Sequence, residues 1–368
     1  MTVKCGDIIE YMQELAPPNL AEDWDNVGLI VGDSKSEVKR VMLCLDATSK
    51  VIDEAVECNA DMIISHHPLI FKGIKKLNDD NIVGKRIIKL VRNNISLYSA
   101  HTNLDTCECG VNQKLAEVLG LQNIRNLNTY REDKVYKLSV FVPFSHVDVV
   151  REAITSEGGG WIGNYSDCTF MTPGIGTFRP LEGTNPFIGS RGKLEKVDEY
   201  RLETVVPECK LKKVVDAMLK AHPYEEVAYD IYPLKISGKV FSLGKIGDVD
   251  KQVSLNEFVD IVKDKLNIRH VRVIGDYKGV IERVAVFCGS FDRNWVNLNS
   301  REFDIVVTGD VKYHDALDIA ESGRCVIDAG HFATEQIILP ILKNMLSEKF
   351  GNVEFILSSM SIDPFNVI

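Results

Sequence analysis

Ala60-Asp61-Met62-Ile63-Ile64-Ser65-His66-His67-Pro68 is the stretch around which the chain is organised. Its apolar run predicts a buried β-strand, and a proline stops that strand directly after two adjacent histidines. In an open α/β sheet, ligands bind in the crevice beyond the carboxyl ends of the strands. The stretch therefore places two imidazoles where such a fold binds ligands, and we expect the rest of the chain to complete a metal site there.

The composition is that of an ordinary globular protein, and a length of 368 residues favours two domains. With 43 basic and 53 acidic residues the formal charge is -10, which argues against a general nucleic-acid or anionic-membrane binder. The first residues lack the layout of a signal peptide, and no apolar run approaches the roughly 18 residues that span a bilayer.

The nine cysteines are scattered, without the spacing of a zinc ribbon or a disulfide framework. We therefore expect a cytoplasmic protein with reduced thiols. Three of the cysteines lie in apolar, strand-like runs and are expected to fill the core: Cys44, Cys288 and Cys325.

Two segments that alternate strands with helices flank a middle segment of different character, which predicts a two-part α/β core interrupted by an insert. The expected parts are residues 1–129 and 238–368 for the core domain and residues 130–237 for the inserted domain. The insert is expected to follow the order β-α-β-β-α-β, which is that of a ferredoxin-like α+β domain. Its glycines between residues 158 and 192 indicate turns, because no phosphate-loop motif occurs among them.

The ends of other predicted strands supply further residue types that bind metals. They are His101, Asp105, Asp310 and His331, and Glu335 follows His331 by four residues. Residues four apart on a helix share a face, so His331 and Glu335 can point into one cavity from the first helical turns. The dipole of a helix also favours a carboxylate near its start.

Three imidazoles (His66, His67 and His331) and two carboxylates (Asp105 and Glu335) are too many ligands for a closed structural zinc site. They suit two metal ions that share a bridging carboxylate or water. Because His66 and His67 are adjacent, we expect them to reach different ions. Mixed imidazole and carboxylate ligation suits zinc, manganese or iron, and the sequence does not choose among them.

A single histidine at the end of a strand is more often a polar residue leaving the core than a metal ligand. That interpretation applies to three histidines outside the set: His146, His222 and His270.

Several motifs resemble those of the NGG-interacting-factor-three-like family, whose members are known as GTP cyclohydrolase type 2 homologues. They are Ser65-His66-His67-Pro68, Ala100-His101-Thr102-Asn103-Leu104-Asp105, Gly309-Asp310-Val311-Lys312-Tyr313-His314 and Asp328-Ala329-Gly330-His331-Phe332-Ala333-Thr334-Glu335. Trp24-Asp25-Asn26-Val27-Gly28-Leu29 is similar to the N-terminal signature of the family.

The resemblance covers residues 1–128 and 238–368 and implies a site with two divalent metal ions. Its ligands would be His66, His67, Asp105, His331 and Glu335, with Glu335 as the bridge. It also implies a cytoplasmic protein that assembles into a ring-like homohexamer.

The middle segment resembles the insert of the longer bacterial members of this family, which is similar to the ferredoxin-like domains of the CutA and PII types. The likeness lies in the run Ala221-His222-Pro223-Tyr224-Glu225-Glu226. It raises a metal-binding or effector-binding role for His222, although packing in the core is the favoured interpretation.

The first functional hypothesis is a metal-dependent hydrolase that opens the purine ring of GTP or hydrolyses a related nucleotide or phosphoester. His101 and His314 are candidates for proton transfer, because histidine titrates near neutral pH. Their alternative role is to orient the metal ligands.

The second hypothesis is a non-catalytic protein, in which metals stabilise an oligomer or are themselves the cargo and the insert binds an effector or partner. An open coordination position would favour the hydrolase, and a sealed site ligated only by protein would favour the second hypothesis.

Overall fold

The computed structural model describes residues 2–292 and 301–366 of the chain. The chain forms two compact units. The core unit combines Met1–Tyr130 with Phe241–Ile368, and the inserted unit is Arg131–Val240. The described residues form a mixed α/β protein with four sheets. None of their helices has the length and apolar character needed to cross a membrane.

The first sheet of the core unit has the strand order β1-β4-β3-β2-β17. Its strands are β1 (Gly28–Val31), β2 (Arg40–Cys44), β3 (Met62–Ser65), β4 (Ser96–Ser99) and β17 (Glu354–Leu357). Strands β17, β2, β3 and β4 run parallel, and β1 is antiparallel to β4. Every residue of β3 and β4 is buried, as expected for parallel strands that are covered on both faces.

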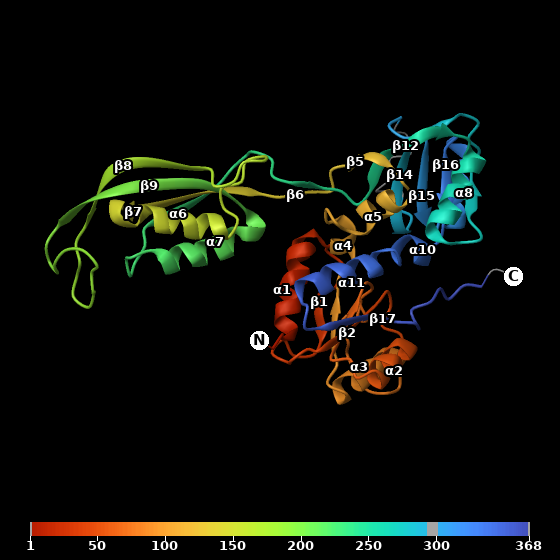
Figure 1. Cartoon of the computed structure of the whole chain (residues 1–368), viewed down its shortest axis with the longest axis horizontal. Helices are drawn as coiled ribbons and strands as arrows, with labels where there is room; N and C mark the ends of the chain where they lie inside the picture. Colours follow the sequence, from red (N-terminus) through yellow and green to blue (C-terminus); the bar gives the residue numbers. More distant parts are fainter. Residues whose placement is uncertain (1, 293–300, 367–368) are drawn as a thin grey trace. The chain divides into compact units, whose positions relative to one another are not determined.

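Helices cover both faces of this sheet (Figure 1). On one face, α2 (Ser49–Glu57) and α3 (Ile82–Arg92) bury residues such as Ile52 and Leu90 against the strands. On the other face lie α1 (Cys5–Leu15) and α11 (Ile338–Lys349), whose apolar residues join the largest hydrophobic cluster of the core unit. A short 3₁₀ turn, η1 (Pro18–Leu20), follows α1.

The second sheet has the strand order β13-β16-β15-β14-β12-β5. Its strands are β5 (Gln122–Asn126), β12 (Lys245–Val253), β13 (Arg272–Ile274), β14 (Ile281–Ser290), β15 (Ile305–Gly309) and β16 (Cys325–Asp328). The central strands β14, β15 and β16 are parallel. The helices associated with this sheet are α5 (Val111–Val118), α8 (Leu255–Leu266) and α9 (Tyr313–Glu321).

The two core segments of the chain are interlocked rather than folded as separate halves. Strand β17, from the last part of the chain, pairs with β2 of the first segment. Strand β5, from the first segment, pairs with β12 of the second. The largest hydrophobic cluster contains residues of both sheets, so the two sheets share this part of the core.

The inserted unit is a four-stranded antiparallel sheet with the order β10-β7-β9-β8. Its elements are β7 (Val135–Pro143), η2 (Phe144–His146), α6 (Val147–Ser156), β8 (Thr169–Phe178), β9 (Glu195–Pro207), α7 (Glu208–Ala221) and β10 (Tyr229–Pro233). The order is therefore β-α-β-β-α-β, and α6 and α7 lie side by side against one face of the sheet (Figure 1). Where the chain passes between the units, the short strands β6 (Arg131–Glu132) and β11 (Val240–Phe241) pair with each other.

Candidate metal centre

The first sheet of the core unit contributes three histidines and an aspartate from two neighbouring strand ends. His66 and His67 follow β3 directly, and their backbone N–H groups bond to the end of β2. Strand β4 ends at Ser99, and after Ala100 the chain reaches His101, which directly precedes the short helix α4 (Thr102–Thr106). Asp105 lies on that single helical turn, so His101 and Asp105 emerge close together.

The second sheet contributes residues from the carboxyl ends of β15 and β16. Asp310 follows β15, and His331 and Glu335 are the first and last residues of the short helix α10 (His331–Glu335). The backbone beneath them requires glycine at residue 289, where φ is +66° and a Cβ atom would overlap the Glu335 carboxylate. The strand ends of the two sheets therefore bring these side chains into one cluster.

Glu335 is the centre of this cluster and is 2% exposed. Its Oε2 lies 3.1 Å from His67 Nε2 and 3.1 Å from His331 Nε2. Its Oε1 lies 3.7 Å from His66 Nε2, which is itself 3.5 Å from Asp105 Oδ1. The two carboxylate oxygens thus face different sets of side chains.

The outer nitrogen of each imidazole is held by an oxygen that only accepts hydrogen bonds. His66 Nδ1 contacts the Ala100 carbonyl at 2.9 Å, and His67 Nδ1 contacts Asp46 Oδ1 at 3.1 Å. His331 Nδ1 contacts Asp310 Oδ2 at 2.9 Å. In the neutral ring Nδ1 must then donate, which leaves the Nε2 lone pair pointing at Glu335. Histidine ligands of metals are oriented in this way.

The lone pairs of the Nε2 atoms consequently face one another and the Glu335 carboxylate at the centre of the cluster. His67 Nε2 and His331 Nε2 are 3.2 Å apart. Two buried atoms, His66 Nε2 and Glu335 Oε2, have no hydrogen-bond partner among the residues that the structure describes. Such an arrangement requires either added protons or a cation.

The pKa values of these groups show how strongly the cluster attracts positive charge. Burial lowers the pKa of His67, but the carboxylates of Asp46 and Glu335 raise it more, to about 10. Burial also lowers the pKa of His331, and Glu335 raises it to about 9. Burial raises the pKa of Glu335, but the facing imidazoles hold it well below the usual value. A divalent cation supplies the same compensation, and this nitrogen and oxygen donor set fits one.

Two groups of side chains have ligand atoms within 4.8 Å of one another and could hold a metal ion. One consists of His67, His331 and Glu335, and the other consists of His66, His67 and His101. Of the predicted ligands, His66, His67, His331 and Glu335 all fall in these groups, and Asp105 lies beside His66. His101 was predicted for proton transfer rather than for ligation.

Asp105 is tied to a residue that the sequence predicts only as core filler. Cys288 Sγ lies 3.2 Å from Asp105 Oδ1 and donates to it, while burial raises the pKa of the Asp105 carboxyl. The Asn112 side chain donates to the Asp105 carbonyl at 3.2 Å and accepts from Cys288 N at 2.8 Å. Cys288 thus packs in the core and also positions Asp105, and its apolar sequence context contains no signal for that role.

His101 stands at the rim of the cluster. Its Nδ1 contacts Asp25 Oδ1 at 2.9 Å. Burial raises the pKa of Asp25, but the hydrogen bonds from His101 and Thr102 together outweigh this effect and lower the pKa to about 2. The rings of Trp24 and Phe71 lie edge-on to His101 at 5.9 Å each and are 56% and 51% exposed. Sequence reasoning assigned no role to Asp25, although the residue lies in the Trp24–Leu29 signature.

Two other histidines lie apart from these groups. His314 is an exposed residue in the first turn of α9, and the ring contact described for it is with Tyr313, so its role in proton transfer stays a prediction. His222, in the inserted unit, is 7% exposed. Its Nε2 contacts the Phe141 carbonyl at 3.0 Å, and its Nδ1 accepts from Tyr224 N at 3.1 Å. Both nitrogens are therefore engaged with backbone, which supports the packing interpretation.

Known proteins match the chain over its whole length. The model of the family described as Duf34/NIF3 (NGG1p interacting factor 3) matches residues 3–364. A protein of Halalkalibacterium halodurans named GTP cyclohydrolase 1 type 2 homolog is 41% identical over 364 residues, which are 98% of each chain. A Bacillus subtilis protein of the same name is 40% identical over 370 residues, covering 100% of this chain and 99% of the relative.

Solved structures match equally broadly. A Bacillus cereus protein related to NIF3 has a TM-score of 0.89 at 39% identity, with full coverage of both chains. A Staphylococcus aureus protein has a TM-score of 0.75 at 33% identity, covering 100% of this chain and 99% of the other.

Proposed function

Because this chain belongs to the Duf34/NIF3 (NGG1p interacting factor 3) family, we propose that its strand-end cluster binds two divalent metal ions and hydrolyses a purine nucleotide or a related phosphoester. The observation behind this proposal is that imidazole Nε2 atoms surround the buried Glu335 carboxylate, although neutral rings with the proton on Nδ1 have no Nε2–H to donate to it. The name of the relatives, GTP cyclohydrolase 1 type 2 homolog, motivates the substrate class.

The two oxygens of Glu335 suggest how the ligands divide. Oε1 faces His66, which lies beside Asp105, and would bind one ion with them. Oε2 faces His67 and His331 and would bind the other ion. Glu335 is then the bridge, and His66 and His67 serve different ions. Mixed nitrogen and oxygen ligation suits zinc first, with manganese or iron as alternatives.

When bound, two such ions lower the pKa of water and provide hydroxide near neutral pH. The protein side chains would supply the remaining functions. His101, held by Asp25, is placed beside His66 and His67 to transfer a proton. The exposed rings of Trp24 and Phe71 offer flat surfaces on which a base could stack next to the cluster.

A second function, metal binding without catalysis, is favoured by the depth of His66 and Glu335, which are each 2% exposed. Against it, the His331 side chain is 31% exposed, so the cluster can be reached from solvent. A structural site is closed, whereas a hydrolytic site keeps a position for water. Access at His331 therefore favours the hydrolase.

The first experiment is elemental mass spectrometry on protein purified without chelators, together with a His66→Ala variant. Roughly two ions per chain, reduced in the variant, are expected from a dinuclear site. His270→Ala is the matched control, because His270 is exposed and lies outside the cluster. Less than one ion per chain, unchanged by His66→Ala, would contradict the metal site.

The loaded protein would then be assayed with GTP and with a phosphoester such as p-nitrophenyl phosphate. Turnover that is lost in His66→Ala and retained in His270→Ala supports the hydrolase. Full metal content without turnover of either substrate class would favour the non-catalytic function.

The family also motivates three broader proposals: a CutA-like or PII-like inserted unit, a ring-like homohexamer and a cytoplasmic location. The β-α-β-β-α-β order of the inserted unit supports the first of these. Sedimentation equilibrium tests the second, and the mass of a single chain across the concentration range would contradict it.

A further inference from the structure

The inserted unit contains a cavity of about 380 Å³. Its lining includes none of the residues of the metal site proposed above. Its walls come from the end of β8, from β9, from the loop at residues 179–188 and from the segment that joins α7 to β10. Four aromatic rings contribute to the lining: Phe141, Phe178, Phe187 and Tyr224. A volume of this order suits a small organic ligand.

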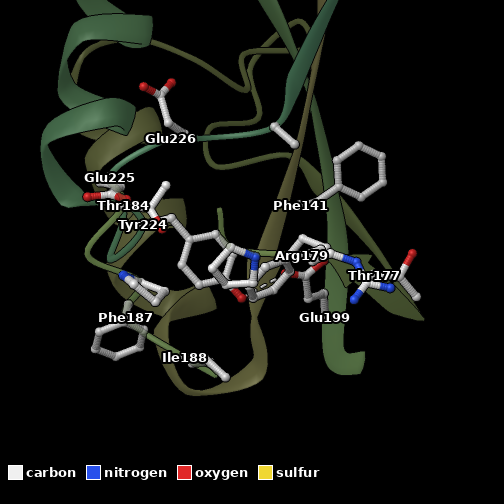
Figure 2. A pocket seen from close by; sticks show the side chains of 15 residues that line it. Phe141, Thr177, Arg179, Thr184, Phe187, Ile188, Glu199, Tyr224, Glu225 and Glu226 are labelled. Atoms are coloured by element: carbon white, nitrogen blue, oxygen red, sulfur yellow. Dashed lines mark hydrogen bonds between the residues drawn. The ribbon is translucent and has the colours of Figure 1, made fainter. Parts of the chain in front are cut away.

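One buried carboxylate lies in this lining. Glu199, on β9, is 7% exposed, and its Oε1 accepts a hydrogen bond from the Tyr224 hydroxyl at 2.9 Å. Figure 2 shows the Tyr224 ring in the middle of the lining with its hydroxyl toward Glu199. Glycine at residue 176 permits this position, because a Cβ atom there would overlap the Glu199 carboxylate.

The backbone of Tyr224 is held in place by a hydrogen bond to His222. Its backbone N–H donates to His222 Nδ1 at 3.1 Å, and His222 Nε2 contacts the Phe141 carbonyl at 3.0 Å. The chain of hydrogen bonds from β7 through His222 and Tyr224 therefore holds Glu199 in place before any ligand arrives. Preorganisation of this kind lowers the entropy cost of binding.

The aromatic rings present their faces and edges around this carboxylate. The Tyr224 ring lies 5.8 Å from the Phe178 ring and 6.3 Å from the Phe187 ring, centroid to centroid. Phe187 is 53% exposed, and its ring also lies edge-on to the His146 ring at 5.2 Å. Ring faces attract cations as well as flat apolar groups.

The charges of the lining favour a positive ligand. It contains three carboxylates, Glu199, Glu225 and Glu226, against one guanidinium, Arg179. Arg179 Nη1 donates to the Gly192 carbonyl at 2.6 Å, so part of its donor capacity is already used. Glu225 accepts from Asn185 N at 2.9 Å and thereby holds the loop over the cavity.

We propose that this cavity binds a small organic cation with a flat body, of the amidine or guanidine class. Its N–H donors would pair with the Glu199 carboxylate, and its plane would lie against the rings of Tyr224 and Phe187. An amidinium matches a carboxylate with two parallel hydrogen bonds, which a compact ammonium cannot form.

Isothermal titration calorimetry on the full, metal-loaded chain tests this proposal with three isosteric probes. Benzamidine is the cation, benzamide is the neutral analogue and benzoate is the anion. Benzamidine is expected to bind at least about tenfold more tightly than benzamide, and benzoate is not expected to bind.

Glu199→Gln keeps the acceptor for Tyr224 but removes the charge, and it should weaken benzamidine binding by about tenfold or more. Glu152→Gln is the matched control with the same change in net charge, because Glu152 is exposed on α6 and lies outside the lining. Phe187→Ala should also weaken binding, and this exposed position removes the risk that a buried substitution merely unfolds the unit.

Three results would each overturn the proposal. They are benzoate binding as tightly as benzamidine, equal affinities in Glu199→Gln and Glu152→Gln, and no heat of binding for benzamidine up to about 10 mM. The first would assign the cavity to an anion held by Arg179.

Discussion

Both units of the molecule bury a glutamate, but they surround it in opposite ways. Glu335 in the core unit faces three imidazole nitrogens whose protons lie on the far side of each ring. Glu199 in the inserted unit receives a hydrogen bond from a tyrosine hydroxyl and is surrounded by aromatic rings. The same side chain thus lies among acceptors in one unit and beside a donor in the other.

The difference shows that the neighbours of a buried carboxylate select the chemistry of its ligand. Around Glu335, no arrangement of protons on neutral rings satisfies all the acceptors, so a metal ion fits. Around Glu199, one oxygen has a donor and the space beside it is apolar, so an organic cation fits. Four predictions test this contrast.

The largest effect is expected when the two glutamates are exchanged for glutamine one at a time. Glu335→Gln should bring the metal content well below that of the unchanged protein, because the amide cannot bridge two ions. Glu199→Gln should leave the metal content unchanged. Elemental analysis of both variants measures the metal content. Equal metal content in the two would contradict the prediction that only Glu335 binds metal.

A smaller loss is expected when an imidazole loses the group that orients it. Asp310→Asn removes the charge beside His331 Nδ1 and should weaken metal affinity by about 10–100-fold. Asparagine tolerates the positive φ of 48° at this position, so the backbone should survive. Competition with a chromophoric chelator measures the affinity.

Asp260→Asn, on the surface of α8, is the control for that experiment. A wild-type affinity in Asp310→Asn would show that Asp310 does not support His331.

The next effect is a pH dependence of the metal-free protein. The pKa values of His67 and His331 rise from 6.5 to about 10 and about 9 on folding. Protonation of these rings therefore stabilises the folded state fully below about pH 6.5, and this contribution is lost as the pH rises toward 9 and 10. The Tm of chelator-treated protein should fall over that range.

Glu335→Gln is the comparison for this pH series, because it removes the carboxylate that raises both pKa values. Its Tm should change less with pH. Parallel curves for the two proteins would contradict the coupling between Glu335 and the imidazoles.

The smallest effect on the metal site is expected from removal of the whole inserted unit. A chain that joins Tyr130 to Phe241 through a short linker should stay folded and keep its metal, but lose benzamidine binding. Elemental analysis and calorimetry on the same sample measure both. A metal-free or insoluble product would contradict the independence of the two units, which stays a prediction.

Much of the site could be predicted from the sequence because each residue marks a strand end or a helical turn. His66 and His67 follow an apolar run, and the spacing of four between His331 and Glu335 places both on one helix face. Cys288 and Asp25 could not be found in this way. Their roles depend on contacts with Asp105 and His101, which lie 183 and 76 residues away in the chain.

The fold shows the same limit. Periodicity predicts strands, but it does not say which sheet a strand joins, and so the exchange of β5 and β17 between the segments could not be predicted. The glycines at residues 158–192 predict turns and give no signal for the cavity. Gly176 among them leaves room for a carboxylate that belongs to another strand.

The pairing of β17 with β2 has a consequence for biosynthesis. His66 and His67 leave the ribosome early, whereas Glu335 follows His66 by 269 residues and β17 begins 288 residues after it. At about 5–20 residues per second, the nascent chain waits tens of seconds before its first sheet and its central carboxylate are complete. Metal capture should therefore be a late event in the life of each new chain, after translation has nearly finished.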